Sequence, residues 1–254
     1  MEYAYISSAV AVKTIKEDEK NGVFEIGGLF AGYGLTIGNA LRRALLSSLP
    51  GAAVTEIKVK NAPHEFSTIP GVKEDIVEIM LNFKKLRFCL HTDEPQVLAL
   101  KLKGEKTVTG GDIKLNAEVD LMNPDEVLAH LTAKDAELDI EVTVERGLGY
   151  VPVEARKSDG GRLSIGTIAL DAIFTPVQHV NYTIEDMRVG DRTDYNRLRI
   201  EITTDGTISP SAALHKASNI LKDHFDKVSS VEVKEFESPE EEKTEAKKAK
   251  KAKK

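Results

Sequence analysis

The sequence predicts an α+β fold in which a discontinuous two-layer domain, an antiparallel sheet with two long helices, is interrupted by an inserted, mostly antiparallel-β domain. Two strand patterns followed by a helix pattern occur near the start of the chain and again near its end. The stretch between them consists of short runs in which apolar and polar residues alternate, which is typical of half-buried antiparallel strands. We therefore expect the discontinuous domain at residues 1–50 and 175–236, the insert at 51–174 and a charged tail at 237–254.

Composition favours a folded protein with an acidic body. The 254 residues are 41% hydrophobic and 30% charged, which is enough apolar material for a sizeable core. The formal net charge is −6, and since the segment from Glu237 onward holds five Glu and seven Lys, the body before it carries −8. An acidic body argues against direct wrapping of duplex nucleic acid, which needs a basic face.

The sequence predicts neither cysteine-based redox chemistry nor a membrane-spanning helix. Cys89 is the only cysteine, so neither a disulfide framework nor a thiolate metal cluster is built within the chain, and its neighbours Phe88 and Leu90 favour a buried thiol. No apolar run reaches the ~18 residues that a membrane helix needs. The first ten residues lack the basic segment of a secretory signal, so we expect a cytoplasmic protein.

The first elements are a hairpin and a helix. Val10 and Val12 precede the polar stretch "KEDEKNG", whose Asn21-Gly22 pair is a strong two-residue turn signal, and "VFEI" follows as the second strand. Thr36 is the expected N-cap of a helix that runs to about Leu49 and stops at Pro50-Gly51.

The residue pattern in the middle of the chain predicts several strands and one helix between them. The alternating runs are "EIKVK", "RFCL", "LALKLK", "IKLNAEVDL" and "LDIEVTVE". The interrupting helix places one set of apolar side chains on a single face: Val72, Ile76, Ile79, Met80 and Phe83. The segment "RGLGYVPVEARKSDGG" is rich in turn residues and is expected to be a surface loop.

The end of the chain repeats the strand and helix pattern. Two alternating strands, "HVNYTIEDMRV" and "NRLRIEITTDG", precede a long helix with Ser209 as N-cap and Pro210 at its first position. The final 18 residues, from Glu237, hold no large apolar side chain, so we expect them to be disordered.

The glycines before the first helix raise the question of a nucleotide site. Gly32, Gly34 and Gly38 resemble a dinucleotide fingerprint, but their spacing holds one extra residue. The strand before them contains Glu25, whereas the first strand of a dinucleotide-binding fold is buried on both faces. No phosphate-binding lysine loop, nucleophile elbow or metal-binding pair of histidines occurs in the sequence. We therefore expect no catalytic, cofactor or metal site.

A helical wheel gives the first helix two different faces. Ile37, Ala40, Leu41, Ala44, Leu45 and Leu49 form a broad apolar face. Asn39, Arg43 and Leu46 lie on the other side, with Arg42 at the boundary. A large apolar residue flanked by Asn and Arg is the composition of an interface patch, although a single exposed Leu is also common on any surface.

The second long helix has one apolar stripe. The stripe contains Ala213, Leu214, Ala217, Ile220, Leu221, Phe225 and Val228, and His224 lies within it. The spacing of its residues at 214, 217, 221, 224 and 228 is heptad-like and permits helix-to-helix dimerisation.

Five long strings carry a resemblance to a known family. They are "GLTIGNALRRALLSSLPGAAVTEIKV", "HEFSTIPGVKEDIVEIMLNFK", "RGLGYVP", "IGTIALDAIFTPV" and "RVGDRTDYNRLRIEITTDGTISPSAAL", in this order over about residues 1–230. This pattern resembles the N-terminal assembly and dimerisation portion of the bacterial DNA-directed RNA polymerase alpha subunits. The resemblance implies a homodimer on which the catalytic beta and beta-prime subunits assemble, with polymerisation and its Mg ions in those subunits and no cofactor on this chain.

The resemblance also implies roles for particular residues. The dimer interface is expected to use both long helices through Ile37, Leu41, Ala44, Leu45, Leu214, Ala217, Leu221, Phe225 and Val228. Asn39, Arg43 and Leu46, together with the "HEFST" loop, match the beta-contacting surface. Contact with beta-prime is expected from Lys84, Leu170 and Arg188.

Two points stay open at this stage. The family usually continues into a helical C-terminal domain that binds promoter DNA, and the sequence instead ends in "KKAKKAKK", which would give a weak, sequence-independent attraction to DNA or serve only as a solvated tail. An unrelated dimeric scaffold and a nucleotide-binding enzyme are the alternative functions, and neither explains the ordered strings.

Overall fold

The computed structural model describes residues 9–60, 62, 64–158 and 166–232, and the predicted tail at 237–254 lies outside these ranges. The chain divides into two compact units, Met1–Leu221 and Lys222–Lys254. The first unit contains two large hydrophobic cores, one built on residues 24–49 with 177–217 and the other on residues 54–170. The α+β class predicted from the sequence is confirmed.

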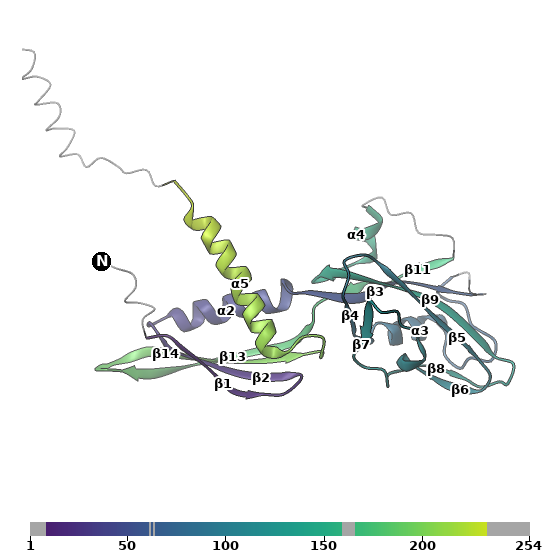
Figure 1. The fold of residues 1–254 in the computed structure, drawn as a ribbon, viewed down its shortest axis with the longest axis horizontal. Helices are drawn as coiled ribbons and strands as arrows, with labels where there is room; N and C mark the ends of the chain where they lie inside the picture. The colour runs from purple at the N-terminus through teal and green to yellow at the C-terminus, as the bar shows by residue number, and fades with distance from the viewer. Residues whose placement is uncertain (1–8, 61, 63, 159–165, 233–254) are drawn as a thin grey trace, which may run out of the picture. The chain divides into compact units, whose positions relative to one another are not determined.

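One antiparallel sheet joins the two ends of the first unit (Figure 1). Its strands lie in the order β1-β2-β14-β13, with the bounds Ala11–Glu17, Asn21–Leu29, Arg192–Thr204 and Val177–Val189. The central pairing brings together distant segments, since Phe24 of β2 lies opposite Ile200 of β14. The expected hairpins at both ends are therefore present and pair with each other.

The turn of the first hairpin differs from the prediction. Asn21 and Gly22 already belong to β2, and the chain turns before them, where the Asp18 N–H donates to the Asn21 carbonyl at 2.7 Å. Gly22 serves close packing instead: a Cβ at this position would lie 2.5 Å from the Cβ of Pro210, at the start of the last helix. A glycine that makes room for a neighbouring element looks in sequence like a glycine that makes a turn.

Two helices cover one face of this sheet (Figure 1). Helix α2 spans Tyr33–Ser47 and contacts β13 and β14, while α5 spans Pro210–Ser229 and runs from the first unit into the second. Ser209 accepts the Ala212 N–H at 3.4 Å, so the predicted cap of α5 is confirmed. The fully or nearly fully buried residues between helices and sheet include Phe24, Leu41, Leu45, Leu198, Ile200, Ala213 and Ala217.

The second core packs against a larger antiparallel sheet. Its strands follow the order β5-β9-β3-β4-β7, with β11 also paired to β3, and their bounds are Gln96–Lys103, Glu137–Leu148, Pro50–Val59, Phe88–Leu90, Val119–Leu121 and Thr167–Ala169. Two smaller sheets pair β6 (Lys106–Thr109) with β8 (Val127–Leu131) and β10 (Tyr150–Val151) with β12 (Ala172–Ile173). The predicted strand "IKLNAEVDL" is wrong over most of its length, because only its end forms β7 and a short 3-10 helix, η1 (Gly110–Asp112), precedes it.

Two helices belong to this part of the chain. Helix α3 spans Ile76–Phe83, and its three inward residues, Ile76, Ile79 and Phe83, are fully buried. Asp75 caps it by accepting the Glu78 N–H at 2.7 Å, so Val72 packs against the core from outside the helix rather than on its face. Helix α4 spans Val153–Ser158, where the sequence predicted only a loop.

No helix among the described residues is long and apolar enough to cross a membrane.

Candidate partner-binding surfaces

The start of α2 is occupied by a side chain from the sheet. The helix begins after Gly32, whose φ of 84° is in the left-handed region, so the predicted N-cap at Thr36 is wrong. The Oδ1 atom of Asn196 accepts the N–H groups of Gly32 at 2.9 Å and Gly34 at 3.4 Å. An internal amide therefore fills the place that a phosphate takes at a helix N-terminus.

The other two glycines of the motif lie inside α2 and face the sheet. A Cβ on Gly34 would lie 3.0 Å from the side chains of Asn196 and Ile184. A Cβ on Gly38 would lie 3.0 Å from Leu198 and Tyr182. Both glycines thus allow the helix backbone to approach β13 and β14 closely, and the resemblance to a nucleotide fingerprint comes from packing.

The outer face of α2 is polar and basic. Asn39, Arg42 and Arg43 are exposed, whereas Leu41, Ala44 and Leu45 face the sheet. Leu46 departs from the wheel: it is half-buried and packs against the core, and its carbonyl accepts the Thr175 hydroxyl at 3.2 Å. Arg43 therefore remains a surface residue free for a partner, while Leu46 also supports the fold.

Five of the nine residues expected at the dimer interface belong to the core of the single chain. Leu41, Ala44, Leu45, Leu214 and Ala217 are buried against the chain's own sheet, and Leu45 has 0% of its surface exposed. Ile37 and Leu221 are half-buried. An apolar stripe in the sequence does not distinguish a side chain that contacts the chain's own sheet from one that contacts a second copy. The expected dimer interface therefore included residues that belong to the core of the single chain.

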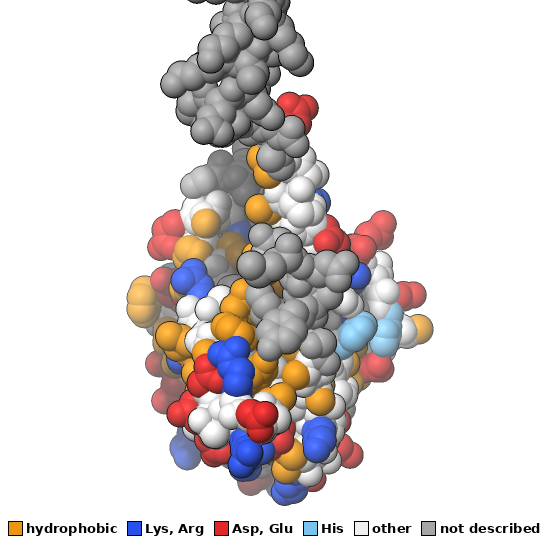
Figure 2. Space-filling view, turned by 90° about the vertical axis from the view of Figure 1, so that its left-hand side faces the viewer, with side chains coloured by type: hydrophobic (Ala, Val, Ile, Leu, Met, Phe, Trp, Pro, Cys, Tyr) orange, Lys and Arg blue, Asp and Glu red, His pale blue; other side chains and the backbone are white. Residues whose placement is uncertain are grey.

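Several large apolar side chains remain exposed on the two long helices. In the second unit, Phe225 and Val228 of α5 are 66% and 68% exposed. On α2, Tyr33 and Leu35 are 43% and 61% exposed. The view onto the hairpin end of the four-stranded sheet shows hydrophobic side chains gathered among charged ones (Figure 2). Large apolar groups that gather at water-facing positions are one mark of an interaction site.

A groove of about 500 Å³ brings together two of the residues expected to contact beta-prime. Lys84, directly after α3, and Leu170, directly after β11, both line it. The lining also includes His64 and Glu65 of the "HEFST" loop, Leu81 of α3 and Asp171. Leu170 is itself only 2% exposed, so the groove presents mainly its neighbours to a partner.

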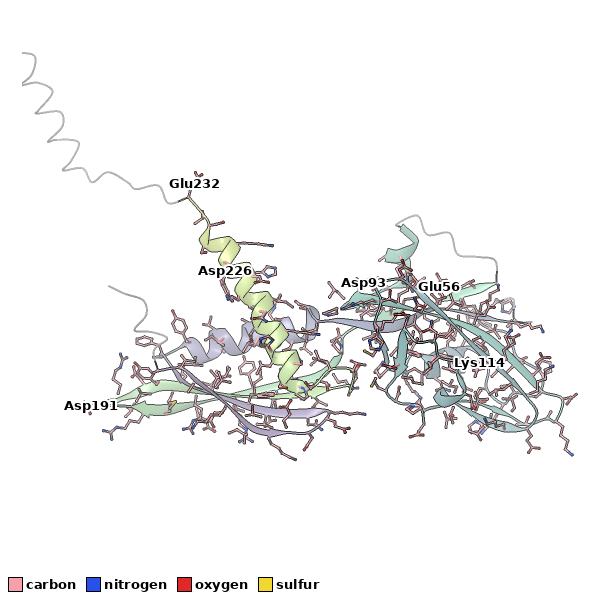
Figure 3. All side chains as sticks on the ribbon, in the orientation of Figure 1. Glu56, Asp93, Lys114, Asp191, Asp226 and Glu232 are labelled. Carbon is pink, nitrogen blue, oxygen red and sulfur yellow. The ribbon has the colours of Figure 1, made fainter. Side chains whose placement is uncertain are left out.

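Arg188 lies on a different sheet. It is an exposed residue of β13, close to the hairpin tip at which Figure 3 labels Asp191. Its guanidinium donates to the Gly190 carbonyl at 2.8 Å and lies 3.9 Å from the Asp191 carboxylate. The groove lining does not contain Arg188, so the structure joins Lys84 with Leu170 and leaves Arg188 at a separate site.

His130 makes a structural pair with Glu74. His130 on β8 holds Glu74 in two ways: its Nδ1 lies 2.5 Å from Oε1, and its backbone N–H donates to Oε2 at 2.7 Å. Burial alone would raise the pKa of Glu74, but the hydrogen bonds from His130 outweigh it and the pKa is lowered. Among the described residues, no group of three or more His, Cys, Asp or Glu side chains is placed to hold a metal ion.

Sequence patterns missed the residues that organise these surfaces. Asn196, Glu74 and Asp171 each act through a contact with a segment far away in the chain. Of these three residues, only Asn196 had a signal in the sequence, because it is a polar residue within an alternating strand.

Comparison with known proteins identifies relatives over most of the chain. A family model described as the RNA polymerase Rpb3/RpoA insert domain matches residues 56–175. The chain is 49% identical to the DNA-directed RNA polymerase subunit alpha of Symbiobacterium thermophilum over 84% of this chain and 66% of that protein. It is 46% identical to the subunit of the same name from Alkaliphilus oremlandii, over 88% of this chain and 72% of that protein. The chain thus spans about two thirds of the length of the curated relatives it matches.

Proposed function

The chain belongs to the family of bacterial DNA-directed RNA polymerase alpha subunits, and from this premise we propose that it is the homodimeric scaffold on which the catalytic beta and beta-prime subunits assemble. The proposal places the protein in the cytoplasm, where transcription occurs. Polymerisation and its Mg²⁺ ions are assigned to the partner subunits, and this chain supplies binding surfaces.

The observation that carries the proposal is the division of α2 into two faces. The inner face is fixed to the chain's own sheet through Leu41, Ala44 and Leu45. The outer face presents Arg43, a planar cation with five N–H donors that suits a carboxylate or carbonyl on another protein. A helix whose inner face is fully used within the fold has its outer face available for a partner, which is what a scaffold subunit requires.

Surfaces on other elements are proposed to make the remaining contacts of the scaffold. The exposed apolar half of α5, with Phe225 and Val228, is proposed as the dimer interface. The groove at Lys84 is proposed as the beta-prime contact, with Arg188 as a separate contact to the same subunit. Binding sites on different elements allow one dimer to hold two large subunits at once.

Co-expression tests this assignment directly. The chain, purified with tagged beta and beta-prime subunits, is expected to form a complex with two copies of this chain, measured by native mass spectrometry. The isolated chain is expected to bind no nucleotide in calorimetry at micromolar concentration. A chain that forms a homodimer but binds neither subunit would support the alternative of an unrelated dimeric scaffold. A chain that stays monomeric and binds neither subunit would contradict both readings, and saturable nucleotide binding would support the enzyme alternative.

A further inference from the structure

Asp171 joins three elements at one wall of the groove. It lies between β11 and β12, and its Oδ1 accepts the N–H of Val153, the first residue of α4, at 3.1 Å. Its Oδ2 lies 3.9 Å from Nζ of Lys84, the residue directly after α3. All three residues line the groove.

The charge of Asp171 also affects Tyr150 of β10. The pKa of the Tyr150 phenol is raised, first by partial desolvation and then by the charge of Asp171 and a hydrogen bond to it. One carboxylate thus accepts a backbone N–H, lies 3.9 Å from an ammonium group and raises the pKa of a phenol through its charge. Because each of these comes from a different element, the position of the carboxylate depends on the local fold rather than on its own short segment.

This arrangement matters most for Lys84. A lysine side chain has four rotatable bonds and loses rotamer entropy when it is fixed. The Lys84 side chain is 29% exposed, so it is partly ordered by its surroundings before any partner binds. Binding of a partner to a lysine that is already directed into the groove loses less side-chain entropy than binding to a freely moving lysine.

The neighbouring residue shows the contrast. Lys85 directly follows Lys84, and its Nζ lies 3.6 Å from Glu126 and 3.0 Å from Oδ1 of Asn82. Lys85 is 58% exposed and is absent from the lining of the groove. The two lysines therefore have similar partners but only Lys84 is presented to the groove, which makes the Lys85–Glu126 pair a matched control.

We infer that Asp171 is a positioning residue that holds Lys84 and the start of α4 in the geometry to which the beta-prime-type subunit binds. The inference rests on the proposed function and deepens it, because it names the residue that prepares this surface. Asp171 acts through Lys84 and is not itself required to touch the partner.

The test compares Asp171→Asn with Glu126→Gln in the dimer bound to the beta subunit, with affinity for beta-prime measured by fluorescence titration. Asn keeps an acceptor for the Val153 N–H but loses the charge that holds Lys84. We expect Asp171→Asn to weaken binding roughly three- to fivefold, the range of an exposed ion pair. Glu126→Gln is expected to bind as wild type.

A double-mutant cycle separates positioning from general damage. In the Lys84→Ala background, Asp171→Asn is expected to cause no further loss of affinity, because its effect passes through Lys84. Absorbance titration of the phenols, with Tyr150→Phe as reference, is expected to show Tyr150 ionising at lower pH in Asp171→Asn. Additive losses, or wild-type affinity in Asp171→Asn, would overturn the inference alone. Failure of the wild-type dimer to bind beta-prime would overturn the proposed function with it.

Discussion

Asn196 on β14 accepts the backbone N–H of Gly32 at 2.9 Å, which fixes the first turn of α2 to the centre of the four-stranded sheet. Its amide nitrogen donates to Asp186 on β13 at 3.2 Å, so the side chain is satisfied on both sides. This single buried residue determines where α2 begins.

Replacing Asn196 with Ala is therefore expected to destabilise the protein. The change leaves the N–H groups of exposed Gly32 and buried Gly34 without their acceptor, at a cost of about 1–3 kcal/mol in the free energy of unfolding. Urea denaturation measures the loss. Asn39→Ala, on the exposed face of the same helix, is the control and should change stability by less than about 0.5 kcal/mol.

Gly38→Ala tests the close approach of α2 to the sheet. Alanine gains about 1 kcal/mol of helix propensity over glycine, but its Cβ would lie 3.0 Å from Leu198 and Tyr182, and overpacking of this kind costs about 1–3 kcal/mol. We expect a net decrease in melting temperature. Gly111→Ala meets nothing closer than 3.6 Å and serves as the control. A more stable Gly38→Ala protein would show that the sheet yields readily.

The pair of Glu74 and His130 predicts an acid-sensitive contribution to stability. The pKa of Glu74 is lowered from its ordinary value of 4.5, so its stabilising effect is complete above that value and is lost as the pH falls through the lower, folded-state pKa. Denaturation at a series of pH values should show a smaller acid loss in Glu74→Gln than in wild type. Parallel curves for the two proteins would contradict the role of this carboxylate.

Arg43→Ala is expected to separate partner binding from folding. Arg43 is exposed, so the melting temperature and the dimer should be unchanged. Affinity for the beta subunit should fall by about tenfold or more, the effect of losing an interface arginine. A pull-down with sedimentation of the free variant measures both. Leu46→Ala is a poorer probe, because half-buried Leu46 also contributes to the core.

Charge substitutions on α5 and α2 distinguish the dimer interface from the core. Phe225→Glu with Val228→Glu changes exposed residues, so we expect a folded monomer by circular dichroism and sedimentation equilibrium. Leu45→Glu places a charge in a site with 0% exposure and should unfold the chain. If the α5 variant stays dimeric at low concentration, the interface lies elsewhere.

The sequence was sufficient where local pattern and fold agree. The alternation of apolar and polar residues predicted both pairs of terminal strands. The spacing of Ile76, Ile79 and Phe83 predicted the buried face of α3. Sequence patterns failed where contacts between distant segments determine the structure. Gly22 and Gly38 make room for other elements, and Asn196 accepts the N–H groups at the start of α2 in place of the predicted cap at Thr36. Among candidate site residues, Lys84 and Leu170 share a groove, but nothing in the pattern separated buried Leu45 from exposed Phe225.

The pairing of β2 with β14 has a consequence for how the protein is made. Leu29 lies opposite Asn196, so the first hairpin finds its neighbour only after about 170 further residues have been synthesised. At roughly 5–20 residues per second, this delay is on the order of ten to thirty seconds. During that time the inner face of β2, with Phe24 and Ile26, has no β14 beside it, and of the two helices in the same core only α2 has been synthesised. The nascent chain therefore needs protection of its earliest segment, and refolding from denaturant should be slow because this closure comes late.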